Sequence, residues 1–68
     1  MTAQWVYAAG SAWVTFDSAT QKMIESLWER DGATWINCQC FHGPIYVDTS
    51  EMVVHFNNYS YTIARRKC

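Results

Sequence analysis

Residues 5–32 have the sequence WVYAAGSAWVTFDSATQKMIESLWERDG, and this segment decides the fold. Its first part alternates in side-chain type on both sides of Gly10-Ser11, which is a typical turn dipeptide. Two short alternating runs joined by such a turn are the pattern of a β-hairpin. The sequence therefore predicts an antiparallel hairpin over residues 5–16.

After Phe16 the pattern changes to a helical period. Ser18 and Gln21 have the spacing of a capping box, which marks the N-terminus of a helix. The apolar side then recurs at helical intervals, at Thr20, Ile24, Leu27 and Trp28. Gly32 suits the left-handed residue that follows a helix. We therefore predict one amphipathic helix of about three turns, whose apolar stripe packs on a flat partner.

The second half of the chain predicts further strands. Alternating or apolar runs occupy residues 33–41, 45–47, 52–56 and 59–64, with turn sequences at His42-Gly43-Pro44, Asp48-Thr49-Ser50 and Asn57-Asn58. The predicted order is two strands, one helix and three or four more strands. This order predicts an α+β domain in which one helix packs against a strongly curved antiparallel sheet.

The chain has 68 residues, which is enough for one domain with one core. Half of the residues are hydrophobic, and large aromatic side chains must supply much of so small a core. We therefore expect core positions for all four tryptophans: Trp5, Trp13, Trp28 and Trp35. A net charge of -1 gives no global basic field, and no apolar run approaches the ~20 residues of a membrane span. We expect neither DNA nor a membrane as a partner.

The three cysteines are Cys38, Cys40 and Cys68. An odd number makes a poor disulfide framework, so we expect reduced thiols and an intracellular location, nuclear or cytoplasmic. The run Cys38-x-Cys40-x-His42 is similar to part of a metal cluster. It lacks the usual two-residue spacing and an obvious fourth ligand, so we assign no metal and no cofactor and leave the role of these residues open.

Catalytic patterns are absent from the sequence. It contains no nucleophile with a visible base partner, no glycine-rich phosphate loop and no paired carboxylates at a turn. We therefore expect a protein that is not an enzyme.

The order of several residues matches a known family. Trp5 lies eight residues before Trp13 across a turn that contains glycine, and Glu25 follows on the predicted helix. This arrangement resembles the WWE domain, which is named for two tryptophans and a glutamate. The match continues at Phe16-Asp17, Val47-Asp48, Met52, Asn57 or Asn58, and Arg65-Arg66. It extends from Trp5 to Lys67.

The resemblance implies a half-barrel sheet of about six strands with a helix in its concavity. It also implies a host, because WWE domains occur inside poly(ADP-ribose) polymerase family members and ubiquitin ligases. We therefore expect residues 1–68 to be a single WWE-like domain, excised from a larger protein whose other domains are its neighbours. The family is best known for binding the iso-ADP-ribose unit, so poly(ADP-ribose) or an ADP-ribosylated protein is the expected partner.

The resemblance also implies a ligand site that this chain keeps only in part. Tyr7 matches the ligand-binding tyrosine that lies two residues after the first tryptophan of the family. Five further family positions carry residues without the expected aromatic, amide or cationic group: Gly10, Val14, Ile45, Val54 and Thr62. A lost charged or paired hydrogen bond costs ~1.5–3 kcal/mol, so two such losses weaken binding by about a hundredfold or more.

The candidate ligand-binding residues are Tyr7, Tyr46, His55 and Arg65. Tyr46 and His55 are neighbours of two changed positions, and a strand bulge would bring them into the site, whereas a regular strand turns them to the opposite face. Arg65 belongs to a basic run that fits either a phosphate contact or a solvated strand end. We expect Glu25 to anchor a loop or to pair with a cation.

The sequence leaves two functions open. The first is a non-catalytic module for ADP-ribose-containing ligands with a partly degraded site. The second is a protein-interaction or structural module on the same fold that no longer binds ADP-ribose. In that case its apolar groove suits a partner helix or a neighbouring domain.

Overall fold

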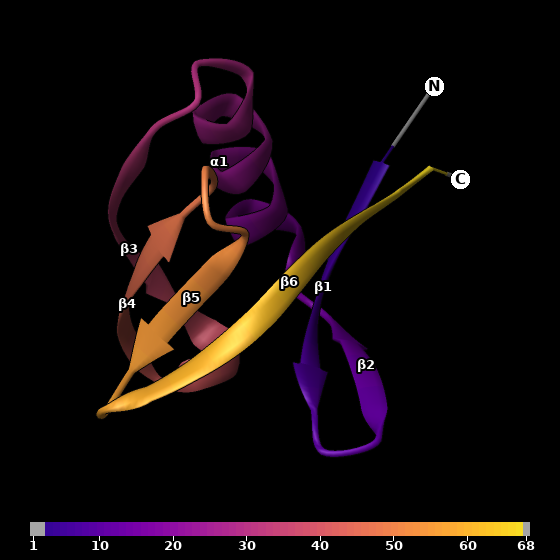
Figure 1. The fold of residues 1–68 in the computed structure, drawn as a ribbon, viewed down its shortest axis with the longest axis vertical. Coiled ribbons are helices and arrows are strands. Elements are labelled where there is room, and N and C mark those ends of the chain that lie inside the picture. The colour runs from indigo at the N-terminus through magenta and orange to yellow at the C-terminus, as the bar shows by residue number, and fades with distance from the viewer. Residues whose placement is uncertain (1–2, 68) are drawn as a thin grey trace.

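The computed structural model describes residues 3–67. Along the chain, the elements are β1 (Ala3–Ala9), β2 (Ala12–Thr15), α1 (Ser18–Glu29), β3 (Ala33–Cys38), the 3₁₀ helix η1 (Gln39–Phe41), β4 (Gly43–Asp48), β5 (Val53–Phe56) and β6 (Tyr59–Lys67). Figure 1 shows the helix beside β3, β4 and β5, and the long β6 running past it to β1. The predicted α+β class is confirmed.

The six strands form one antiparallel sheet in the order β2-β1-β6-β5-β4-β3. β6 pairs with β5 through its first half and with β1 through its second half, where Trp5 lies opposite Arg65. Among residues 3–67, β2 and β3 have one neighbour each, so the curved sheet stays open and α1 packs on its concave side. This is the half-barrel that the sequence predicts.

Helix α1 has a different N-cap from the predicted one. Asp17, not Ser18, is the capping residue: its carboxylate accepts the backbone N–H and the hydroxyl of Thr20, at 3.1 and 2.8 Å. Gln21 does not complete a capping box, because its side chain donates to the carbonyl of Phe16 and accepts a backbone N–H of β1. These bonds instead fasten the start of the helix to the hairpin.

The left-handed residue after the helix is Asp31 (φ 56°), and the assignment of that role to Gly32 was wrong. Gly32 is explained by packing, because a Cβ atom there would lie 3.0 Å from Cδ1 of Leu27. Glycine therefore lets the chain pass close to the buried face of α1.

The predicted strand over residues 33–41 is too long. β3 ends at Cys38, and η1 follows over Gln39–Phe41, with His42 as its C-cap at a left-handed φ of 58°. The next two residues, predicted as part of a turn, already belong to β4. As a consequence, Phe41 leaves the line of the strand and packs against the core.

The predicted turn at Asn57-Asn58 is confirmed. Both residues have left-handed φ values, 49° and 67°, and they connect the paired residues Phe56 and Tyr59. Asparagine tolerates this conformation better than most residues, so the turn chemistry fits a tight hairpin.

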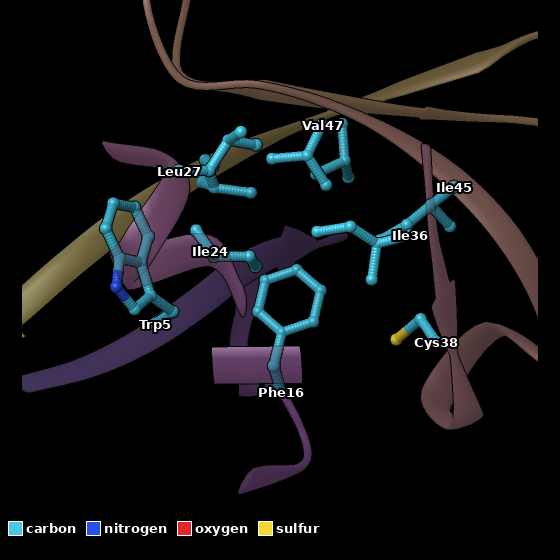
Figure 2. Close-up of a cluster of buried hydrophobic side chains, with 10 residues drawn as sticks. Trp5, Phe16, Ile24, Leu27, Ile36, Cys38, Ile45 and Val47 are labelled. Atoms are coloured by element: carbon cyan, nitrogen blue, oxygen red, sulfur yellow. The ribbon is translucent and has the colours of Figure 1, made fainter. Parts of the chain in front are cut away.

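The core lies between α1 and the concave face of the sheet. Its buried side chains come from the helix, from the strands of the sheet and from the segment before the helix: Trp5, Phe16, Ile24, Leu27, Ile36, Cys38, Ile45, Val47, Val54 and Ile63. In the view of Figure 2, Trp5 and Cys38 lie at opposite ends of this cluster, with Phe16 and Ile24 between them.

The expectation that all four tryptophans fill the core was wrong for three of them. Trp5 is fully buried, but Trp13, Trp28 and Trp35 are 47%, 40% and 64% exposed. Trp13 and Trp35 lie on strands opposite Ala8 and Tyr46, on the convex face that the single helix does not cover. A sheet with one helix buries one face, so alternation places half of its large side chains in solvent.

None of the helices in residues 3–67 is long and apolar enough to cross a membrane.

Candidate functional site

One end of the concave face holds a charged and aromatic network. The indole N–H of Trp5 donates to Oε1 of Glu25 at 2.8 Å. Arg65 donates to the same carboxylate twice, from Nε at 2.9 Å and from Nη2 at 2.7 Å. Its guanidinium also lies 4.4 Å from the ring centre of Trp28. The expected pairing of Glu25 with a cation is confirmed.

This pairing fixes the charge state of both partners. The hydrogen bonds from Arg65, helped by that from Trp5, outweigh burial and hold the pKa of Glu25 below its usual value. The same hydrogen bonds raise the pKa of Arg65. The ion pair uses Nε and Nη2 of Arg65, so a ligand phosphate would have to bind through the remaining guanidinium N–H groups, beside the negative charge of Glu25.

The other end of the concave face holds an aromatic cluster. It consists of Tyr7, Phe16, Phe41, Phe56 and Tyr61. The Phe41 ring centre lies 4.9 Å from that of Tyr7, 5.2 Å from Phe56 and 5.3 Å from Tyr61. The ring of Tyr7 also lies 4.8 Å from that of Phe16. Tyr7 is thus half-buried beside two phenylalanines, and Phe41 competes with any base that would stack on its ring.

The phenol of Tyr7 is held in its neutral form. Burial is the main reason why its pKa is raised, and the nearby thiols of Cys40 and Cys38 act in the same direction. A neutral phenol can donate one hydrogen bond and accept others, as an adenine edge or a ribose hydroxyl requires.

Tyr46 and His55 lie on the convex face, away from Tyr7. They pair with each other across β4 and β5, while the neighbouring Ile45 and Val54 are fully buried on the concave side. The ladder between the two strands continues without the bulge that would have turned Tyr46 and His55 inward.

The convex side chains form a row across four strands. Trp35 lies 5.3 Å from Tyr46, the Tyr46 ring lies 6.2 Å from that of His55, and Nδ1 of His55 is hydrogen-bonded to the hydroxyl of Ser60 at 3.0 Å. The four sequence candidates therefore occupy three separate places: the aromatic cluster, the convex row and the network around Glu25.

The positions that depart from the expected site are also spread out. Ile45 and Val54 contribute to the core, and Val14 pairs with Tyr7 at the strand edge. Gly10 lies in the hairpin turn, and Thr62 lies opposite Val53 on the convex side. Ile45 and Val54 therefore give the concave side apolar groups in these places, whereas Thr62 does not face it.

A third cluster joins Asp17 to Cys38 and Cys40. Both sulfur atoms lie 3.6 Å from Oδ1 of Asp17. Burial opposes ionisation of Asp17, but hydrogen bonds from Thr20 and from the two thiols outweigh it and lower the pKa of the carboxyl. Asp17 and Cys38 also line a pocket of about 750 Å³, and His42 lines it with them.

The sequence alone did not identify Asp17 and Phe41 as site residues. Asp17 is separated from the thiols by more than twenty residues, and only the helix cap brings it to them. Phe41 continued the alternation of a predicted strand, and its apolar ring beside two cysteines was the available signal.

The comparisons with known proteins agree with the fold. A family model described as the WWE domain matches residues 3–67. No curated protein and no solved structure matches the chain.

Proposed function

The chain belongs to the WWE domain family, and we propose that it is a non-catalytic module that recognises ADP-ribose-containing ligands at Tyr7 with reduced affinity. WWE domains are binding domains for poly(ADP-ribose) or for protein partners. The observation that supports this proposal is the half-buried, neutral phenol of Tyr7 on the concave face, beside Tyr61.

The reduced affinity follows from what surrounds Tyr7. Phe41 packs against its ring and therefore competes with adenine for Tyr7. Glu25 already occupies Nε and Nη2 of Arg65, so fewer donors of the guanidinium remain for a phosphate, and the carboxylate offsets its charge. If only the molecules in which Phe41 is displaced can bind the ligand, and these are a small fraction of the total, the apparent dissociation constant is the intrinsic one divided by that fraction. We expect a dissociation constant for iso-ADP-ribose in the sub-millimolar to millimolar range.

The host in this proposal is an intracellular ADP-ribosyltransferase or ubiquitin ligase, nuclear or cytoplasmic, with neither DNA nor a membrane as a partner of this domain. The module would bring such a protein to poly(ADP-ribose) or to ADP-ribosylated targets.

Titration of the domain with iso-ADP-ribose, followed by NMR, tests the proposal. We expect shifts in Tyr7, Phe41 and Tyr61, with weaker binding in Tyr7→Phe, which keeps the ring and removes the hydroxyl. Tyr46→Ala on the convex face is the matched control and leaves binding unchanged. Absence of shifts at millimolar ligand would reject the proposal.

A second candidate function is protein recognition through the convex face. Trp35 is 64% exposed beside Tyr46, and Trp35 and His55 line a surface depression of about 580 Å³. Exposed tryptophan and tyrosine are frequent anchors of protein interfaces. A partner that is captured by the domain, is insensitive to excess poly(ADP-ribose) and is lost in Trp35→Ser would favour this function. Binding of iso-ADP-ribose at micromolar concentration would count against it.

A further inference from the structure

The end of β3, the 3₁₀ helix η1 and the N-terminus of α1 bring a carboxylate and two thiols together. The side-chain ligand atoms of Asp17, Cys38 and Cys40 lie within 4.8 Å of one another. Both cysteines are free of disulfides, so both sulfur atoms are available. From this convergence we propose that Asp17, Cys38 and Cys40 bind a zinc-type divalent cation.

The two sulfur-to-oxygen distances in this group fit one tetrahedral ion. With metal–sulfur bonds of about 2.3 Å and a metal–oxygen bond of about 2.1 Å, a tetrahedral site places sulfur and oxygen about 3.6 Å apart. Both sulfur-to-Oδ1 distances are 3.6 Å. An ion can therefore replace the thiol protons while Oδ1 of Asp17 keeps its present distance from both sulfur atoms.

The carboxylate is already oriented for this role. Oδ2 of Asp17 accepts the backbone N–H of Thr20, and Oδ1 accepts the hydroxyl of Thr20. Partners of this kind fix a ligand's direction and commonly accompany metal ligands. Asp17 can thus bind the ion through Oδ1 while Oδ2 continues to cap the helix.

The chemistry of the ligands selects the ion. Thiolates favour zinc over magnesium or calcium, which prefer an all-oxygen shell. Asp17 and Cys38 line one pocket together with His42, which lies two residues after Cys40 in the sequence, so an imidazole or a water molecule can approach an ion there. Imidazole nitrogen or water are both ordinary fourth ligands of zinc.

Metal binding would also act on the aromatic cluster. Phe41 lies between Cys40 and His42 in the sequence and packs on Tyr7. An ion that joins Cys40 to Asp17 fixes η1 to the start of α1, and it thereby fixes Phe41 over Tyr7.

The test is addition of Co²⁺, as a spectroscopic probe, and of Zn²⁺ to the reduced protein near neutral pH. Every protein in the assay carries Cys68→Ser, because Cys68 lies outside the described residues and would add a third thiol. We expect one Co²⁺ per chain, with tetrahedral d–d bands and a thiolate-to-metal charge-transfer band. Calorimetry should give one Zn²⁺ per chain.

Three variants separate a metal site from nonspecific thiol binding. Cys40→Ser, at an exposed position, should weaken Zn²⁺ binding at least about tenfold, since even outer partners of a metal ligand are worth that much. Asp17→Asn keeps a good N-cap and should also weaken binding. Gln39→Ala, at an exposed position between the two cysteines, should leave it unchanged. Circular dichroism of each variant confirms the fold.

Two results would overturn the inference. One is the absence of a charge-transfer band at equimolar Co²⁺ in the reduced protein. The other is unchanged Zn²⁺ affinity in the folded Cys40→Ser variant. Both results are independent of whether the domain binds iso-ADP-ribose.

Discussion

Arg65 and Glu25 are separated by 40 residues in the sequence and meet through two hydrogen bonds, at 2.9 and 2.7 Å. The pair joins β6 to α1 at the edge of the core, where the buried indole of Trp5 shares the same carboxylate. Glu25 therefore accepts three hydrogen bonds from two residues, and its loss leaves the buried indole N–H of Trp5 and the cation of Arg65 without their acceptor.

Stability at acid pH should depend on Glu25. Because its folded pKa lies below the usual value of 4.5, its contribution is present above that value and is lost as the pH falls through the lower folded pKa. Glu25→Gln should reduce stability near neutral pH and flatten its loss below about pH 5. Urea unfolding between neutral and acid pH measures this.

The matched control for that experiment is Glu51→Gln, which removes an exposed carboxylate from the connection between β4 and β5. Its profile should follow that of the parent protein. If Glu25→Gln and Glu51→Gln gave the same profile, the ion pair with Arg65 would not contribute to folding.

Removal of Phe41 should expose Tyr7. Phe41→Ala deletes the ring that lies 4.9 Å from Tyr7, so iso-ADP-ribose affinity should rise severalfold. The same change should lower the free energy of unfolding by roughly 1–2 kcal/mol, because the ring is only partly buried. Ligand titration and urea unfolding of the same sample measure both effects. Unchanged or weaker binding would show that Phe41 does not cover the ligand site.

The cap of α1 gives a third prediction. Asp17→Ala should lower the free energy of unfolding by about 1 kcal/mol, whereas Asp17→Asn should have a smaller effect, since asparagine is also a good N-cap. The measurement is made with a chelator present, so that any bound metal does not contribute. Equal losses in both variants would place the effect in the charge of Asp17 and not in its capping bonds.

The hairpin between β5 and β6 gives a fourth prediction. Asn58 has a φ of 67°, so Asn58→Gly should be neutral or slightly stabilising. Asn58→Val should cost at least about 1 kcal/mol, because a β-branched residue is strained in the left-handed region. Thermal unfolding of the two variants compares them directly. A stable valine variant would mean that the turn can take another conformation.

Local signals predicted the parts of the fold that depend on neighbours in the sequence. The hairpin around Gly10, the amphipathic period of α1 and the turn at Asn57-Asn58 each depend on residues a few positions apart. The same limit explains the failures. The alternation of residues 33–41 continues through Phe41, but β3 ends at Cys38, and Phe41 instead packs against aromatic side chains from four other segments of the chain.

The candidate site was harder to predict than the fold. Alternation places Tyr46 and His55 on one face of their strands, but composition does not say which face the helix covers. Nor does the spacing of Cys38 and Cys40 indicate that the nearest carboxylate belongs to the cap of a helix earlier in the chain. The sequence identified Arg65 as a candidate phosphate contact, but only the structure shows that its guanidinium is hydrogen-bonded to Glu25.

The length of β6 has a consequence for the order of assembly. Within residues 3–67, the N-terminal hairpin and the β3–β5 meander meet in the sheet through β6, and Ala3 pairs with Lys67. Closing the loop between Ala3 and Lys67 costs conformational entropy before the contacts between β1 and β6 can stabilise it. Folds that depend on such distant pairs form slowly. During synthesis on a ribosome, the N-terminal hairpin and the β3–β5 meander would therefore each keep an unpaired strand edge until β6 has emerged and pairs with both.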